Sequence, residues 1–277
     1  MYRFLFRPRW IAFHLLVVGG IVLMVNLGFW QLDRLEQRRD FNERVVARTD
    51  LPVERIGELL GEANDAGDPD PDDPAVRDLA WRRVVATGTY RPDEQFLVVN
   101  RSQNGRAGVN VATPMTLPDG RALIVNRGFV PLDINPPAPP GGEVNVQGIV
   151  RPSQERRTGQ LSDPADGTLT EVQRIDIERL EDQIAGSVLP VYVDLLESRP
   201  AEQPGLPEPV VQPDLSDGPH LSYAVQWFIF AASVVVGWVL AVRYSVTKRR
   251  RDAAAPADPP PPGDDEPATE LARTPDA

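Results

Sequence analysis

Residues 11–32 read IAFHLLVVGGIVLMVNLGFWQL, and residues 221–242 read LSYAVQWFIFAASVVVGWVLAV. Neither stretch contains Lys, Arg, Asp or Glu. At about 1.5 Å of rise per residue, a helix of either length crosses the roughly 30 Å hydrocarbon core of a bilayer. The sequence therefore predicts a membrane protein with two transmembrane helices, at 11–32 and 221–242.

Basic residues next to these spans predict their orientation. Arg3, Arg7 and Arg9 precede the first span, and a cluster from Arg243 to Arg251 follows the second. Under the positive-inside rule, residues 1–10 and 243–277 are cytoplasmic, and residues 33–219 form an extracytoplasmic domain. We expect the protein in the cytoplasmic (plasma) membrane of a bacterium.

A cleaved signal peptide is the alternative interpretation of the N-terminus, because it also combines basic residues with an apolar run. The run at 11–32 is longer than the apolar core of a signal peptide, and residues 26–31 (NLGFWQ) contain no small-residue cleavage pattern. An uncleaved anchor is therefore favoured.

The composition excludes several classes of function. The chain has no cysteine and two histidines, His14 and His220, so residues 33–219 contain neither residue type. Nucleophilic triads and His-based zinc sites are thus excluded in that domain. No paired-carboxylate motif is present, and no basic stripe indicates nucleic-acid binding. We expect a protein that is not an enzyme, with the net charge of −11 serving solubility.

The middle of the chain has the pattern of a β-rich domain. The first helix is expected to continue to Arg48, and a short helix at 53–60 precedes an acidic loop at 62–78. Runs rich in Val, Ile and Thr predict strands, joined by hairpins at 91–93 and 118–120, with one helix at 177–184. The expected strands are 83–90, 95–101, 108–117, 122–130, 144–151, 169–175 and 191–196.

The predicted fold class is thus an α+β membrane protein. Two transmembrane helices flank an extracytoplasmic antiparallel β-barrel or sandwich with a packed helix. A proline-rich linker at 200–219 leads back to the membrane, and the tail from 253 to 277 has too few apolar residues to fold.

The two histidines are expected at opposite membrane faces, and only His220 has suitable neighbours. Tyr223 and Trp227 follow it at helical spacing, with Gln226 beside them, and the first span offers Gln31 and Arg34 at the same depth. An imidazole, a cation and aromatic walls are what a heme requires at its edge. The alternative is that the aromatic residues are interfacial anchors and the histidine faces lipid headgroups.

Two strand ends share an Asn-Arg pair, Asn100-Arg101 and Asn126-Arg127-Gly128. Asn and Gly tolerate turn geometry, so we interpret both as strand-end turns. The functional alternative is that the two arginines bind propionates or an acidic partner loop.

These motifs, in this order, resemble the Surfeit-locus (Surf) family of cytochrome c oxidase assembly factors. The resemblance rests on LGFWQLDR at 27–34, RRV at 82–84 with Gly88, NR at 100–101, TP at 113–114, NRGFVP at 126–131 and HLSYAVQW at 220–227. It covers nearly the whole chain except the acidic insertion and the tail. Phe129 departs from the Trp that family members usually carry after Arg-Gly.

The resemblance implies a role in inserting heme a into the large catalytic subunit of the oxidase. It places His220 at the position implicated in ligating heme iron. Our hypothesis from helix spacing adds Tyr223 and Trp227 as walls of the porphyrin, Gln226 and Gln31 at the same interface, and Arg34 or Arg127 near a propionate. The implied partners are that large subunit, heme a synthase, other assembly factors and the lipid bilayer. A single axial imidazole suits a temporary holder of heme.

Two other functions compete with this one. A heme-free scaffold would stabilise the nascent large subunit without carrying heme. A two-span receptor is disfavoured because the cytoplasmic tail is too short for an output domain.

Overall fold

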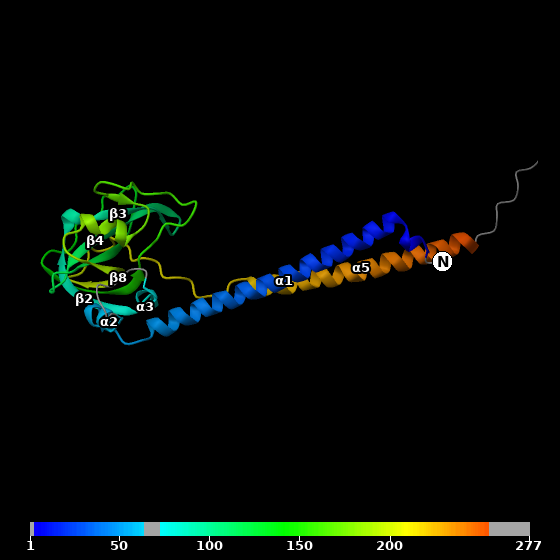
Figure 1. The fold of residues 1–277 in the computed structure, drawn as a ribbon, viewed down its shortest axis with the longest axis horizontal. Coiled ribbons are helices and arrows are strands. Elements are labelled where there is room, and N and C mark those ends of the chain that lie inside the picture. The colour runs from blue at the N-terminus through cyan, green and yellow to red at the C-terminus, as the bar shows by residue number, and fades with distance from the viewer. Residues whose placement is uncertain (1–2, 64–72, 255–277) are drawn as a thin grey trace, which may run out of the picture. The chain divides into compact units, whose positions relative to one another are not determined.

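The computed structural model describes residues 3–63 and 73–254. Its internal contacts divide the chain into two units. The helical unit contains the residues up to Glu36 and those from Gly218 onward, and the β domain is Gln37–Asp217. Figure 1 shows both units, which are described separately below.

The helical unit is built from α5 (His220–Ala254) and the part of α1 (Pro8–Thr49) up to Glu36, with a short 3-10 helix, η1 (Arg3–Phe6), before α1. Their most apolar windows have mean hydropathies of 2.2 and 2.1 and are only 11% and 6% buried. Side chains such as Leu16 and Leu23 therefore need an apolar surrounding that the protein does not supply. The two helices are consistent with a two-span membrane protein, and α1 extends past its apolar run as the sequence predicted.

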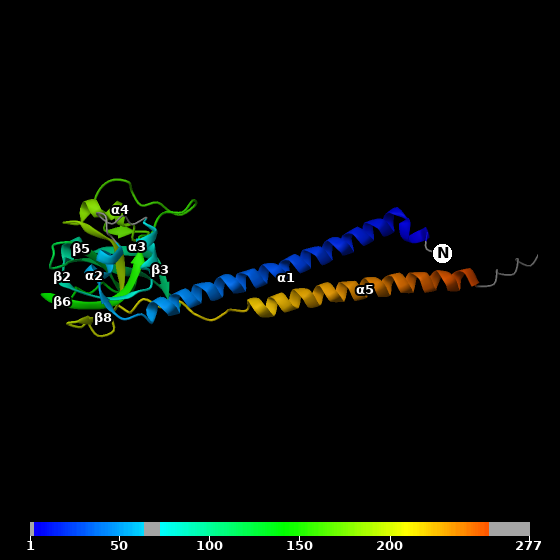
Figure 2. The same cartoon turned by 60° about the horizontal axis from the view of Figure 1, so that its bottom comes forward.

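Small residues bring α1 and α5 together. Ala224 and Ala231 are buried on α5. A Cβ added to Gly28 of α1 would lie 2.7 Å from two ring carbons of Phe228, so the missing side chain makes room for this ring. Phe29 adds an edge-to-face contact with Phe228 at a centroid distance of 5.5 Å. Figure 2 shows the two helices as separate ribbons from a second direction.

The β domain contains one mixed sheet of eight strands in the order β1-β2-β6-β8-β5-β4-β3-β7. A further pairing of β2 with β4 closes β2, β6, β8, β5 and β4 into a ring. The strands are β1 (Glu54–Arg55), β2 (Arg83–Tyr90), β3 (Phe96–Gln103), β4 (Arg106–Thr116), β5 (Ala122–Pro131), β6 (Glu143–Pro152), β7 (Glu171–Val172) and β8 (Val188–Arg199).

The prediction of a purely antiparallel sheet was wrong. β5 and β8 run parallel, as do the short pairs β1–β2 and β3–β7. Parallel neighbours need a long crossover, and the chain between β5 and β8 supplies one that contains β6, β7 and a helix. The local alternation of apolar residues identifies a strand but does not specify the direction of its partner.

One predicted hairpin is present and the other is not. β4 and β5 form an antiparallel pair across residues 118–120, as predicted. At 91–93 the chain instead passes through the 3-10 helix η2 (Pro92–Glu94), and β2 and β3 pair with other strands. The predicted strand at 169–175 is limited to the two residues of β7.

Three short helices accompany the sheet. α2 (Ile56–Ala63) lies near the predicted position, and α4 (Ile177–Leu180) continues as η3 (Glu181–Gln183) where one helix was expected. The expected loop at 62–78 ends in α3 (Pro74–Asp78), which Asp73 caps by accepting a hydrogen bond from Ala75 N at 2.8 Å. The rest of that loop, 64–72, and the tail from 255 onward lie outside the described residues.

Both faces of the central strand β5 are covered, which explains why it is buried throughout. Leu123 and Val125 belong to a core cluster that α2 joins through Leu59 and Leu60. The alternate residues Ala122 and Ile124 point into a second cluster. That second cluster contains Ile177, Leu180 and Ile184, so the helix at 177–183 packs on the sheet as the sequence predicted.

Candidate functional site

His220 is the first residue of α5, and its ring is held by α1. Nδ1 of His220 lies 3.0 Å from Oε1 of Gln31. An amide oxygen only accepts hydrogen bonds, so Nδ1 carries the proton and donates it. In the neutral ring Nε2 then holds a lone pair, and no described residue forms a hydrogen bond with it. This is the tautomer that ligates a metal through Nε2, with the second nitrogen fixed by a hydrogen bond.

Gly218 packs against this imidazole from the preceding turn. Its φ of +68° is a conformation that L side chains rarely adopt. A Cβ at this position would lie 3.5 Å from Cδ2 and 3.7 Å from Nε2 of His220. Glycine therefore permits the turn into α5 and places no side chain beside the Nε2 edge of the ring.

The structure brings only part of the predicted residue set together. Gln31 contacts His220, whereas the guanidinium of Arg34 lies 5.5 Å from the ring centroid of its own-helix neighbour Trp30. Tyr223 is 49% exposed, and Gln226 is also exposed. Trp227 is half-buried and stacks edge-to-face on Phe230 at 6.0 Å. Their roles around a porphyrin stay predictions.

His14 forms the opposite tautomer in the same unit. Trp238 Nε1 donates a hydrogen bond to Nδ1 of His14 at 2.9 Å. An indole N–H only donates, so Nδ1 is the unprotonated nitrogen and Nε2 of the neutral ring carries the proton. At about 1.5 Å per residue, the two histidine pairs lie roughly 25 Å apart along α1. The sequence prediction missed the His14–Trp238 contact. The separation of His14 from Gln31 nearly equals that of Trp238 from His220, so antiparallel helices that pair Gln31 with His220 also pair His14 with Trp238.

Arg127 belongs to the β domain, where its side chain is fully buried. Nε and Nη2 donate to the carboxylate of Glu202 at 3.0 and 2.6 Å, and Nη1 donates to Gln95 Oε1 and to Pro137 O. A guanidinium with this many internal acceptors has a structural role in the domain. Its assignment to a propionate stays a prediction without a contact in its favour.

The two Asn-Arg pairs differ in geometry. Asn100 has φ +58° at an irregularity between Val98 and Arg101, but β3 continues to Gln103, so the prediction of a strand-end turn was wrong at this pair. The turn interpretation of residues 126–128 was wrong, because they continue β5. Gly128 has φ +133°, and a Cβ there would lie 2.2 Å from Glu208 O. Phe129 and Glu208 exchange backbone hydrogen bonds at 2.7 and 2.8 Å, so the returning linker requires a glycine at this point.

The sequence prediction also missed a buried polar pair. Asn126 Nδ2 donates to Asp194 Oδ1 at 2.7 Å, across the parallel pairing of β5 with β8. Burial raises the pKa of Asp194, and Arg151, whose Nε lies 3.5 Å from Asp194 Oδ2, partly offsets this effect. No local pattern signals this pair, because the two residues meet only through the crossover.

The fold and the site together define the class of protein. Two apolar helices, one near each end of the chain, flank a mixed β-sheet domain in sequence. The first residue of the second helix is a histidine whose ring is hydrogen-bonded. The model of the SURF1 family matches residues 18–232. The chain belongs to the SURF1 family, a family of cytochrome oxidase assembly factors.

Curated relatives agree with this assignment. An uncharacterized SURF1-like protein of Mycobacterium tuberculosis is 30% identical over 90% of this chain and 89% of its own length. A SURF1-like protein of Monosiga brevicollis is 29% identical over 80% of this chain and 84% of its own. One from Rickettsia felis is 22% identical over 82% of this chain and 95% of its own.

Proposed function

We propose that this SURF1-family protein binds heme a transiently through Nε2 of His220 and presents it to the large catalytic subunit of cytochrome c oxidase. The observation that carries the proposal is the hydrogen bond between His220 Nδ1 and Gln31 Oε1. It gives the imidazole the tautomer that an iron ligand needs and restricts its rotation.

The donor chemistry around His220 fits a heme that is held and then released. One neutral imidazole supplies a single axial bond, and Gly218 adds no side chain beside the Nε2 edge. Gln31 is a positioning residue, because it acts on heme only through the histidine ring. The bound heme a supplies the redox-active iron that the oxidase later uses.

The proposed topology places His220 at the outer side of a bacterial cytoplasmic membrane. Both termini would then be cytoplasmic, and the β domain would be extracytoplasmic. The basic residues before α1 and near the end of α5 support this orientation.

The test is a pyridine hemochrome spectrum of the full-length protein, purified in detergent from a host that synthesises heme a. We expect heme a in the wild type and in His14→Ala, and its loss in His220→Ala. His14→Ala is the matched control, because it removes the other histidine, whose Nδ1 already accepts from Trp238. Gln31→Leu should retain less heme than wild type because it frees the ring to rotate.

Two results would contradict the proposal. If folded His220→Ala keeps its heme, another residue is the ligand. If folded wild type contains no heme, the scaffold function is favoured, and copurification with the large subunit from cells unable to make heme a would then support it.

A further inference from the structure

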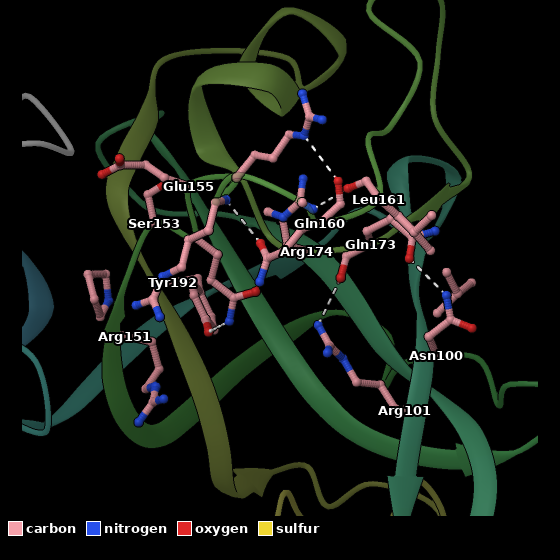
Figure 3. Close-up of a pocket in the computed structure, with 16 residues that line it drawn as sticks. Asn100, Arg101, Arg151, Ser153, Glu155, Gln160, Leu161, Gln173, Arg174 and Tyr192 are labelled. Carbon is pink, nitrogen blue, oxygen red and sulfur yellow. Dashed lines mark hydrogen bonds between the residues drawn. The ribbon is translucent and has the colours of Figure 1, made fainter.

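A second candidate site lies within the β domain and uses none of the residues proposed above to hold heme. A cavity of about 850 Å³ opens between β3, the end of β6 and the chain that follows β6. This volume falls in the range of pockets that bind small molecules. Figure 3 shows Arg101 and Gln173 on one side of the cavity and Arg151 and Tyr192 on the other.

The cavity wall is strongly basic. Five arginines line it, against one carboxylate, Glu155, which is paired with Arg77 at 2.5 Å. These arginines come from β3, β6 and the two segments next to β7: Arg101, Arg151, Arg156, Arg157 and Arg174. Cations concentrated in a concave, partly dry surface attract anions more strongly than the same cations on an open surface.

Several of these guanidinium groups keep unused donors. Arg101 donates once, from Nη2 to Gln173 O at 3.0 Å, and Arg156 Nε donates to Gln160 O at 3.2 Å. The side chain of Arg157 forms no hydrogen bond or ion pair within the described chain. Arg174 differs, because it holds the wall itself through Leu161 O and Asp163.

The floor of the cavity is built and pre-arranged. A smaller cavity of about 170 Å³ adjoins it and shares Arg101, Arg151, Gln154 and Tyr192 with its lining, which also contains the carboxylate of Asp194. The guanidinium of Arg151 is held 3.9 Å from the ring centroid of Trp81. Gln154 donates to Tyr192 Oη at 2.7 Å and accepts from Ile175 N, so the floor side chains have fixed positions.

A buried acceptor at this floor has no donor. Asn126 is only 4% exposed and lines the smaller cavity, and its Oδ1 has no hydrogen-bond partner within the described residues. Arg151 Nε is also buried without a hydrogen bond to any described residue, although Asp194 Oδ2 lies 3.5 Å from it as an ion pair. The unused N–H of Arg151 is a donor that an anionic oxygen can fill, whereas Asn126 Oδ1 needs a donor, which an organic anion supplies only through a hydroxyl or a protonated oxygen.

We propose that this cavity binds a small organic anion that carries two or more carboxylate or phosphate groups. Arg101 and Arg151 at the floor bind one anionic group, and Arg156 and Arg157 at the mouth bind another. The planar guanidinium group of arginine can donate two parallel hydrogen bonds to the oxygens of a carboxylate or of a phosphate. The feature shared by the two ligand types is therefore a negatively charged group with several oxygen acceptors.

The experiment measures binding of two probes, citrate and inorganic pyrophosphate, to the full-length protein in non-ionic detergent by isothermal titration calorimetry. The test variant is Arg101→Gln with Arg157→Gln. Arg101 has one side-chain hydrogen bond to lose, to Gln173 O, and Arg157 has no side-chain partner to lose among the described residues. The control is Arg121→Gln with Arg199→Gln, which removes the same charge at arginines outside the cavity, each beside a local carboxylate.

We expect saturable wild-type binding of at least one probe at about 0.15 M ionic strength, where unspecific surface attraction is screened. The test variant should bind roughly tenfold more weakly or worse, since two charge-assisted contacts are lost, and the control should stay within about twofold. A preference for citrate identifies a carboxylate ligand, and one for pyrophosphate identifies a phosphate ligand.

Two outcomes would overturn the proposal: no saturable binding of either probe, or an equal loss in both double variants, which would reflect net charge alone. Arg157→Gln by itself provides a second test should the double variant unfold, and it should weaken binding about threefold. Neither readout depends on heme, so failure here leaves the proposal for His220 unaffected.

Discussion

Arg127 has the most complete set of internal partners of any arginine in the described β domain. Its side chain is inaccessible, and that of Glu202 is 14% exposed, so this ion pair lies mostly in the interior. A buried ion pair adds little net stability compared with apolar residues, but losing one partner leaves the other charge uncompensated. Asn126-Arg127 is therefore better explained by folding of the domain than by heme binding.

We expect Arg127→Leu to lower the free energy of unfolding by about 3–5 kcal/mol, because Glu202 then keeps a mostly buried, unpaired charge. Denaturant unfolding in detergent, followed by circular dichroism, measures this. Arg121→Leu, at a surface pair with Asp119, should cost less than about 1 kcal/mol. The double variant Arg127→Leu, Glu202→Leu should recover much of the loss, and equal costs for the two arginines would refute the argument.

Asp194 should make stability depend on pH. Burial raises the pKa of this carboxyl in the folded protein, so the folded state binds the proton more readily than the unfolded state does. Ionisation of Asp194 therefore lowers the free energy of unfolding at pH values above the pKa that this carboxyl has in the folded protein. That cost disappears as pH falls through the folded pKa towards the ordinary aspartate value of about 3.9.

Asp194→Asn removes this titration while keeping an acceptor for Asn126 Nδ2. We expect the stability of wild type relative to the variant to increase as pH is lowered from about 7 to about 4.5, the side on which the raised pKa favours the folded state. Parallel denaturant titrations of both proteins measure the difference. A difference that is constant with pH would show that Asp194 does not titrate differently in the folded state.

The contact between α1 and α5 includes one position, Gly28, where a missing side chain makes room for the partner helix. Gly28 lies one turn before Gln31 on α1, and Phe228 fills the space that a Cβ would need. The hydrogen bond between Gln31 and His220 is formed on the same two helices. We therefore expect that separating the helices at Gly28 weakens the hydrogen bond between Gln31 and His220.

We expect Gly28→Leu to reduce the heme a bound per protein to less than about half, because the larger side chain collides with the Phe228 ring and displaces the helices. Gly19→Leu is the control, since a Cβ there meets nothing within 4 Å. Pyridine hemochrome spectra of both variants provide the measurement. Full heme loading of Gly28→Leu would mean that the helix contact does not position His220.

The whole protein offers a clean test of topology because it contains no cysteine. We expect Leu132→Cys, at a 70% exposed position of the β domain, to react with a membrane-impermeant maleimide on intact spheroplasts. Asp252→Cys, exposed near the end of α5, should react only after the membrane is permeabilised. The reverse labelling pattern would invert the proposed orientation.

Much of the architecture could be predicted because its causes are local. Residues 11–32 and 221–242 have too much apolar surface for water, whatever the rest of the chain does. The strand 83–90 has the predicted bounds and alternation, the strand predicted at 122–130 ends one residue later and is buried throughout, and Asp119-Gly120 determines the hairpin between β4 and β5. His220 was selected because it is one of two histidines and has polar and aromatic neighbours at helical spacing, and its role as an iron ligand stays a prediction.

The remaining features arise from residues that meet only after folding. The parallel pairing of β5 with β8 places Asn126 opposite Asp194, and the returning linker places Glu208 O against Gly128. The pairing of α1 with α5 determines which nitrogen of each histidine is protonated. Local periodicity specifies whether a segment forms a helix or a strand, but packing across the whole chain decides which segment it pairs with. The arginine-lined cavity exists only because of that packing.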